Sequence, residues 1–201
     1  AALINLVAVR HALVPADREH RFGHGKVEAL AGLGQAAFIT GSAVFLVFEV
    51  IDRLADPQPI ERSGIAIAVM IFSIVATVAL VTYQRRVARR TNSLAIRADS
   101  AHYLGDVLVN IAVIVAIVLT SQAGWLSADP IIAAGVALYI FYMAWGIARQ
   151  SLDMLMDREL PDADRERIKA IALTDPRVLD AHDLKTRSAG RQSFIQLHLE
   201  M

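Results

Sequence analysis

Long apolar runs separated by short charged blocks dominate the first three quarters of the chain. A helix that crosses a bilayer needs about 20 largely apolar residues. Four runs meet that requirement: 27–54, 64–84, 94–121 and 129–155. The first segment, 1–13, is apolar but too short, so we interpret it as the end of a further span that begins upstream of Ala1. Residues 1–156 are therefore predicted to form a polytopic α-helical membrane domain with about four and a half spans.

The character of the sequence changes at residue 157. Pro161, acidic residues in the first turn and apolar residues along one side predict a surface helix over 161–173. Residues 178–186 and 192–201 are interpreted as strands, because "FIQLHLEM" alternates apolar and polar positions. Gly190 supplies the turn between them. Residues 157–201 therefore predict part of a small α+β domain, cut off after its second strand.

Basic residues are unevenly distributed among the polar segments. The most basic predicted connection contains Arg85, Arg86, Arg89 and Arg90, and further basic residues cluster in the first loop, 15–26. The loops at 55–63 and 122–128 hold few. Loops rich in lysine and arginine remain on the cytoplasmic side of a membrane. The first loop, the arginine cluster and the C-terminal domain are therefore predicted to be cytoplasmic.

Composition narrows the possible chemistry. The mean hydropathy is +0.45, and 20 basic residues balance 20 acidic ones, so the sequence makes no case for nucleic-acid binding. The chain has no cysteine, which excludes disulfides and thiolate metal sites. Any metal ligands must then be histidine, aspartate or glutamate.

One predicted span carries ionisable residues on a single face. In "ADSAHYLGDVLVN", Asp99, His102 and Asp106 stand at i, i+3 and i+7. Such residues are costly inside a membrane unless they are paired or hydrated. His102 and Asp106 lie one turn apart, which suits joint binding of a small cation. Alternatively, they pair with groups on a neighbouring helix. Asp99 lies nearer the cytoplasmic end, where we expect a structural or entrance role.

Two further histidine clusters lie outside the spans. Asp17, His20 and His24 repeat at spacings of three and four, so they can converge on one tetrahedral ion if the loop turns helically. A solvated loop or helix caps are the alternatives. His182 and His198 lie on strands that Gly190 would make antiparallel neighbours. Pairing of those strands could bring the two rings together, or the two histidines are unrelated.

Five of the six histidines thus fall in three clusters, and His11 is left for a helix end or the membrane interface. Polar ligands within several membrane spans favour transport over catalysis. An intramembrane metalloprotease would be expected to carry His-Glu-x-x-His, which the sequence lacks. We therefore predict that the protein is not an enzyme.

Four separated motifs, "HYLGD", "FGHGK", "LMDRELPD" and "AHDLKTR…FIQLHLEM", occur in an order that resembles the cation diffusion facilitator family. The resemblance covers essentially the whole chain and is strongest to bacterial zinc transporters. It implies a six-helix membrane bundle, here the end of span 2 and spans 3–6, followed by a ferredoxin-like cytoplasmic domain. It also implies a homodimer in the bacterial inner membrane.

The resemblance assigns roles to the candidate ligands. His102 and Asp106 would form half of a tetrahedral transport site, whose other half, Asp-x-x-x-Asp, is expected upstream of Ala1. Asp17, His20 and His24 would form a loop site. His182 and His198 would belong to a cytoplasmic zinc cluster, with its other ligands beyond Met201.

Two charged residues complete the set that the resemblance implies. Lys26 and Asp157 would form a charge interlock between the first loop and the end of the last span. Alternatively, they are two independent solvated charges.

The resulting functional hypothesis is efflux of Zn²⁺, with Cd²⁺ or Fe²⁺ as further substrates, in exchange for H⁺. Imidazole with carboxylates suits Zn²⁺, and protons compete with the metal for these ligands. Zinc would also be a structural or regulatory ion. The alternatives are a metal-sensing, regulatory dimer module and a channel without coupled transport.

Overall fold

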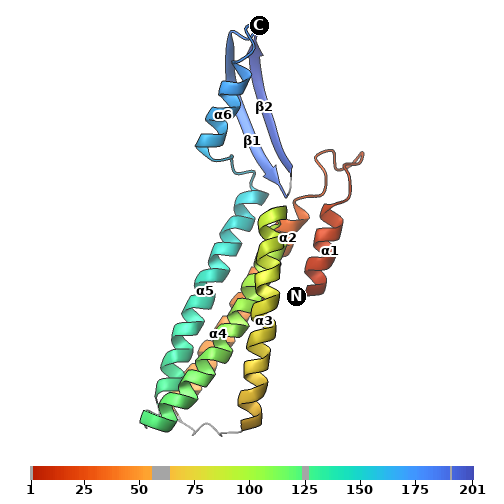
Figure 1. Cartoon of the computed structure of the whole chain (residues 1–201). Coiled ribbons are helices and arrows are strands. Elements are labelled where there is room, and N and C mark those ends of the chain that lie inside the picture. Colours follow the sequence, from red (N-terminus) through yellow and green to blue (C-terminus); the bar gives the residue numbers. More distant parts are fainter. Residues whose placement is uncertain (1, 56–63, 124–126, 191) are drawn as a thin grey trace.

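The computed structural model describes residues 2–55, 64–123, 127–190 and 192–201. In these residues four helices are long and apolar enough to cross a membrane, and they form an elongated bundle (Figure 1). They are α2 (Val27–Ala55), α3 (Gly64–Thr91), α4 (Leu94–Ala123) and α5 (Ala128–Leu155). A short helix, α1 (Ala2–Ala12), packs beside the start of α2 and α4. The predicted loop 55–63 lies almost wholly outside the described residues.

The outer surface of the bundle is apolar. Large side chains such as Phe38, Phe45, Phe72, Tyr142 and Trp145 are more than half exposed. Exposed apolar area of this extent is unusual for a soluble monomer, and a lipid bilayer would cover it. Because every helix satisfies its own backbone hydrogen bonds, these segments are suited to the hydrocarbon region.

Helices α2 and α5 pack closely along their length. Ile39 and Ala43 of α2 form a buried cluster with Ile140 and Ala144 of α5. Nearer the sheet, a Cβ added at Gly32 would lie only 2.7 Å from Ser151 Oγ, so a residue without a side chain is needed there. Small residues at the contact allow the two backbones to approach.

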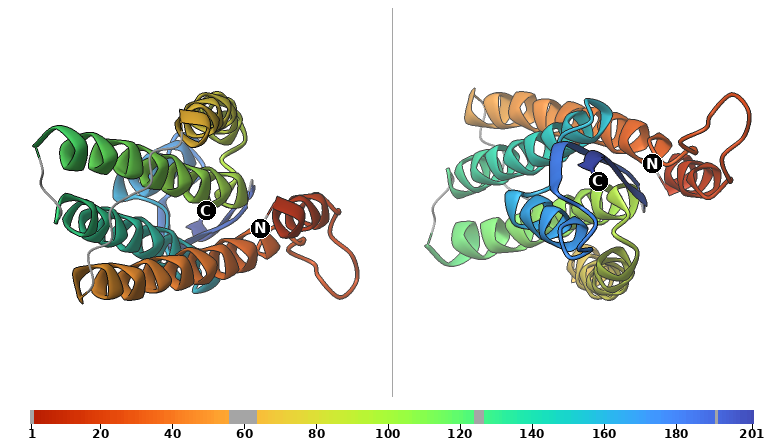
Figure 2. Two further views of the ribbon diagram at one scale, coloured as in Figure 1. Left: turned by 90° about the horizontal axis from the view of Figure 1, so that it is seen from below. Right: turned by 90° about the horizontal axis from the view of Figure 1, so that it is seen from above.

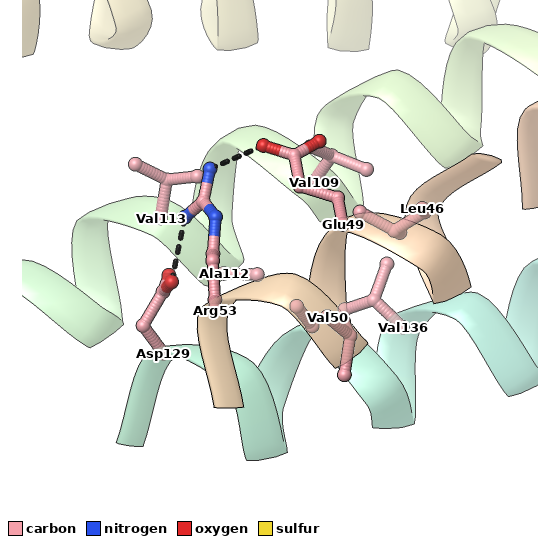
Figure 3. A pocket seen from close by; sticks show the side chains of 10 residues that line it. Leu46, Glu49, Val50, Arg53, Val109, Ala112, Val113, Asp129 and Val136 are labelled. Atoms are coloured by element: carbon pink, nitrogen blue, oxygen red, sulfur yellow. Dashed lines mark hydrogen bonds and ion pairs between the residues drawn. The ribbon is translucent and has the colours of Figure 1, made fainter. Parts of the chain in front are cut away.

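An ion pair joins α2 and α5 at the end of the bundle away from the sheet, which we call the distal end. Arg53 Nη1 lies 2.6 Å from Asp129 Oδ2, and Arg53 Nη2 lies 2.5 Å from Glu49 Oε1 (Figure 3). At the opposite end, Lys26 just before α2 pairs with Asp157 just after α5. The two helices are therefore tied together at both ends.

The predicted basic loop at 85–90 is helical, which corrects the sequence interpretation. Helix α3 continues to Thr91, and only Asn92 and Ser93 separate it from α4. Arginine is a good helix former, so the helix outlasts its apolar segment by two turns. The C-terminal end of α3, which carries these arginines, lies at the end of the bundle nearest the sheet (Figure 1), the side on which the charge argument places it.

The C-terminal part contains one helix and a hairpin. Helix α6 (Asp162–Ala172) packs against β1 (Asp180–Ala189), which pairs antiparallel with β2 (Gln192–Glu200). Gly190 adopts φ +63° at the turn, where glycine avoids steric strain. Figure 1 shows α6 and the hairpin beyond one end of the bundle, and the view from above in Figure 2 draws them in front of it. The backbone of the first loop abuts the hairpin, because a Cβ at Gly25 would lie 2.2 Å from the carbonyl oxygen of Ala189.

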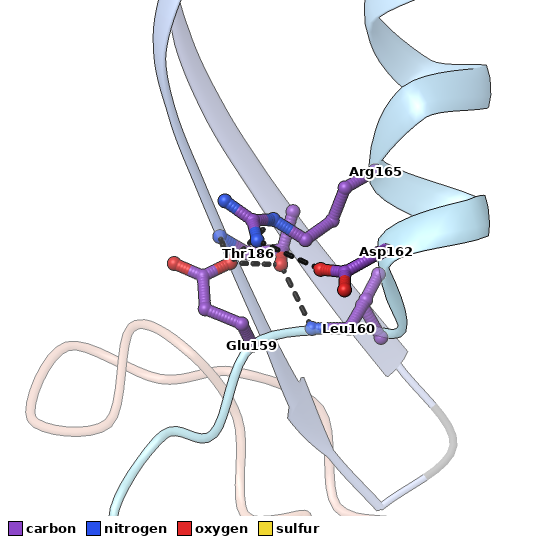
Figure 4. Close-up of polar contacts among 5 residues, drawn as sticks. All are labelled: Glu159, Leu160, Asp162, Arg165 and Thr186. Atoms are coloured by element: carbon purple, nitrogen blue, oxygen red, sulfur yellow. Dashed lines mark hydrogen bonds and ion pairs between the residues drawn. The ribbon is translucent and has the colours of Figure 1, made fainter.

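A polar cluster fixes the segment between α5 and α6 to β1 (Figure 4). The Glu159 carboxylate accepts hydrogen bonds from the backbone N–H and the hydroxyl of Thr186. The same hydroxyl oxygen accepts the N–H of Leu160 at 2.9 Å, and Arg165 Nε lies 3.5 Å from Glu159. The hydrogen bonds of Thr186 hold the pKa of Glu159 below its ordinary value. The hairpin is thus anchored a few residues beyond the membrane exit.

Candidate metal-binding sites

The first candidate pair lies on α4. His102 Nε2 is 4.0 Å from Asp106 Oδ2, across one helical turn, and both side chains remain partly exposed. Within the described residues no third histidine or carboxylate joins them in a compact group. The pair supplies two ligands of a type and spacing suited to one small cation. The sequence analysis predicts that the pair is half of a transport site, and that assignment stays a prediction.

Asp99, on the same face of α4, is bonded differently. It is buried, and its two carboxylate oxygens accept hydrogen bonds from Asn5 Nδ2 at 3.0 Å and Gln84 Nε2 at 2.7 Å. These amides belong to α1 and α3. Asp99 therefore connects three helices, as expected for a structural role.

The loop site is the most complete group. Asp17, His20 and His24 each offer a ligand atom, and all three atoms lie within 4.8 Å of one another. Asp17 Oδ1 is 3.3 Å from His20 Nδ1, and Asp17 Oδ2 is 3.4 Å from His24 Nε2. Zinc–ligand bonds of about 2.0–2.1 Å in a tetrahedron separate neighbouring ligand atoms by roughly 3.3–3.4 Å. The donor set suits Zn²⁺, and each histidine nitrogen lies at about this spacing from one oxygen of Asp17, a different oxygen for each ring.

Local hydrogen bonds favour the ionised form of the Asp17 carboxylate, which is the form that binds a cation. The backbone N–H groups of His20 and Glu19 both donate to Asp17 Oδ1. These bonds, chiefly that from His20, hold the pKa of Asp17 below its ordinary value. The ring of His11, which the sequence analysis set aside, packs edge-on against His24 with centroids 4.9 Å apart. The sequence does not predict this contact, because His11 belongs to α1 and reaches His24 only through the fold of the loop.

The strand histidines meet as a directly opposed pair. His182 on β1 is the register partner of His198 on β2, and their ring centroids lie 5.9 Å apart. Two acidic residues missed by the sequence analysis stand beside them: Asp180 Oδ2 lies 3.2 Å from His182 Nδ1, and Asp183 Oδ2 lies 3.8 Å from His198 Nδ1. A β-bulge that follows His182, where Asp183 has φ +51°, produces the second contact.

The residues of the predicted interlock are in contact. Lys26 Nζ lies 2.9 Å from Asp157 Oδ1 and donates to the carbonyl oxygen of Leu155. Arg187 of β1, not foreseen from the sequence, approaches Asp157 Oδ2 at 3.4 Å. The hydrogen bond from Lys26, aided by the charge of Arg187, lowers the pKa of Asp157. One carboxylate thus receives cations from the first loop and from the hairpin.

Four apolar helices of spanning length and a His–Asp pair on one of them are features expected of a membrane protein that handles cations. The family model for the cation efflux transmembrane domain matches residues 1–156. The model for the cytoplasmic domain of cation efflux proteins matches residues 160–201. The chain therefore belongs to the cation efflux family, also called the cation diffusion facilitators, which confirms the family and the fold class expected from the sequence.

Named relatives agree with that assignment. The cation-efflux pump FieF of Shewanella oneidensis is 49% identical over 201 residues, covering 100% of this chain and 68% of that protein. The pumps of the same name from Klebsiella pneumoniae and Salmonella newport are 47% identical over the same length, which is 67% of each. The chain is thus a membrane protein of a family of divalent-cation efflux transporters.

Proposed function

We propose that the protein exports Zn²⁺ from the bacterial cytoplasm in exchange for protons, as a homodimer in the inner membrane. Cd²⁺ and Fe²⁺ are further candidate substrates. The observation that carries the proposal is the His102–Asp106 pair on a spanning helix of a cation efflux protein. Imidazole with carboxylate suits Zn²⁺ and also accepts Fe²⁺, whereas an all-carboxylate site would favour Mn²⁺.

Coupling to protons follows from the ligands. Zn²⁺ needs a neutral imidazole and an ionised carboxylate, so protons and metal compete for His102 and Asp106. A site exposed alternately to the two sides would load metal where protons are scarce and release it where they are abundant. Imidazole in general titrates near pH 6.5, within the range in which such exchange is useful.

The test is zinc-driven proton flux in proteoliposomes of the full-length protein. His102→Ala should abolish flux, since it removes the imidazole ligand of the pair. His11→Ala removes a histidine at the end of α1, apart from the α4 pair, and should retain it. Flux that His102→Ala leaves unaltered would remove His102 from the transport site, and metal movement without proton movement would favour the channel alternative.

A second candidate function is metal sensing by the cytoplasmic part. The opposed rings of His182 and His198, with carboxylates 3.2 and 3.8 Å away, favour it. Zinc bound there would favour dimerisation and regulate the transporter. If so, His182→Ala should shift the zinc concentration at which transport is activated. The maximal rate should stay within about twofold, because a regulatory ion changes only the balance between two states of the transporter.

A further inference from the structure

A cavity of about 140 Å³ lies between α2, α4 and α5 at the distal end. Its wall is apolar, with Leu46, Val50 and Val136 among its residues, except for the charged side chains of Glu49, Arg53 and Asp129 (Figure 3). One buried water needs about 10–15 Å³ of accessible space. The cavity therefore has room for several waters or for a partly hydrated metal ion.

The α4 wall of this cavity continues the face that carries His102 and Asp106. Val109 and Val113 line the cavity, and positions 102, 106, 109 and 113 follow spacings of four, three and four, which keep them on one side of a helix. At 1.5 Å per residue, Val109 lies roughly 4.5 Å and Val113 roughly 10.5 Å beyond Asp106 along the helix axis. The cavity thus begins on the distal side of the pair, along the same face of α4.

The charged side chains of the cavity form one connected group. Arg53 binds Asp129 through Nη1 and Glu49 through Nη2, so its guanidinium occupies both carboxylates at once. Asp129 is buried, and charge-assisted bonds of this kind are strong where water is scarce. The group has one formal negative charge in excess, which attracts a cation. While Arg53 is in place, neither carboxylate is free to hold that cation.

We propose that this cavity is the distal chamber of the cation path and that Arg53 is its gating residue. Arg53 lines the cavity and occupies Glu49 and Asp129, so these carboxylates do not retain the metal and the ion passes through and leaves. The proposal rests on the proposed transport function, and it assigns a role in release to residues that are not ligands of the His102–Asp106 pair.

Substitutions that change the charge of this group separate a role in release from a structural one. Arg53→Gln frees two carboxylates to bind Zn²⁺. We expect zinc efflux in proteoliposomes to slow. Zn²⁺ added on the distal side should inhibit at a concentration lower by about tenfold or more, because two free carboxylates bind the ion more tightly than two that a guanidinium occupies. The matched control adds Glu49→Gln and Asp129→Asn to Arg53→Gln, which removes the ligands as well, and it should recover most of the rate.

If the ion pairs of Arg53 are needed only for the structure of the bundle, the control variant should not recover its rate. In that case the triply neutral variant stays as slow as Arg53→Gln or slower, and this result would overturn the proposal. An Arg53→Gln variant with normal efflux and normal sensitivity to distal Zn²⁺ would overturn it as well.

A labelling experiment tests the chamber without relying on transport. In a cysteine-free background, Val113→Cys should react with a charged, membrane-impermeant thiol reagent added on the distal side, and faster when Arg53→Gln is also present. Added Zn²⁺ should protect it in the second case. Val115→Cys, an exposed position turned away from the cavity on α4, should face lipid and not react.

The two readouts distinguish failure of the chamber from failure of the transport function. If Val113→Cys is unreactive in both backgrounds, the cavity does not open to the distal side and the proposal is wrong, whatever the flux shows. If it reacts and is protected by Zn²⁺ but His102→Ala leaves flux unaltered, the chamber stands and the assignment of the transport pair falls.

Discussion

At the level of single residues, His24 is the centre of the loop site. Its buried ring faces the carbonyl oxygen of Val14 with Nδ1, at 3.4 Å, and the carboxylate of Asp17 with Nε2, also at 3.4 Å. A carbonyl oxygen only accepts hydrogen bonds, so a neutral ring places its proton on Nδ1. The lone pair of Nε2 then faces a carboxylate. That arrangement is favourable when a proton or a metal ion lies between them.

The loop site should bind zinc with a pH dependence that does not come from Asp17. Because backbone N–H groups lower the pKa of Asp17 from 3.8, its carboxylate is ionised at any pH above that value. Asp17→Asn should therefore weaken Zn²⁺ binding by the same factor, about tenfold or more, at pH 6.0 as at pH 7.5. Titration calorimetry on His102→Ala protein, in which the α4 pair is disabled, measures this factor.

Glu19→Gln is the matched control for that experiment, because it neutralises an exposed acid of the same loop outside the ligand group. It should bind zinc as the parent protein does. An Asp17→Asn defect seen at only one of the two pH values would mean that the carboxylate titrates in this range, against the structure.

At the level of elements, the sequence locates the spans well and their contacts poorly. Apolar runs mark α2, α4 and α5 to within a few residues, since lipid-facing and buried surfaces are both apolar. The apolar runs miss the end of α3. Hydropathy indicates where a segment leaves the membrane, but a helix can continue beyond that point. The bonds from Asn5 and Gln84 to Asp99 could not be predicted, because they depend on how three helices are rotated and stacked.

Glu28 illustrates another contact between elements that the sequence conceals. Its side chain is buried, and Oε2 accepts the backbone N–H of Leu94, the first residue of α4, at 3.0 Å. Glu28→Ala leaves that buried N–H without a partner and should destabilise the protein by about 1–3 kcal/mol. Thermal unfolding in detergent measures the loss.

Glu28→Gln is the comparison, since its amide oxygen can still accept the hydrogen bond. It should retain most of the stability that Glu28→Ala loses. Equal losses in the two variants would show that the charge of Glu28, acting on the N-terminal end of the α4 dipole, matters more than the hydrogen bond.

At the level of the whole molecule, the first loop lies where the membrane bundle meets the hairpin. Phe22 of this loop packs edge-on against Phe194 of β2, and the Arg187 guanidinium stacks over the Phe22 ring at 3.9 Å. The same Arg187 approaches Asp157. The loop that carries Asp17, His20 and His24 is thereby attached to both parts. Metal binding in the loop would stabilise the arrangement in which bundle and hairpin are joined.

Asp157→Asn tests this junction through its pH dependence. Lys26 and Arg187 lower the pKa of Asp157 from 3.8, so their stabilising effect is complete above the ordinary carboxyl pKa and is lost as pH falls through the lowered value. The pair is more than a third exposed, which limits the effect to about 1 kcal/mol or less. At pH 7, Asp157→Asn should speed hydrogen exchange in residues 185–190. As the pH falls further below 3.8, and after correction for intrinsic exchange, the difference should shrink.

The matched control is Asp153→Asn, which breaks a pair with Arg158 near the same end of α5 but does not reach the hairpin. It should leave exchange in residues 185–190 unchanged at both pH values. If it accelerates exchange as much as Asp157→Asn, the hairpin responds to the end of α5 in general. If Asp157→Asn has no effect at pH 7, the hairpin is held by Glu159, Phe22 and Gly25 alone, and the charge interlock does not join the two parts.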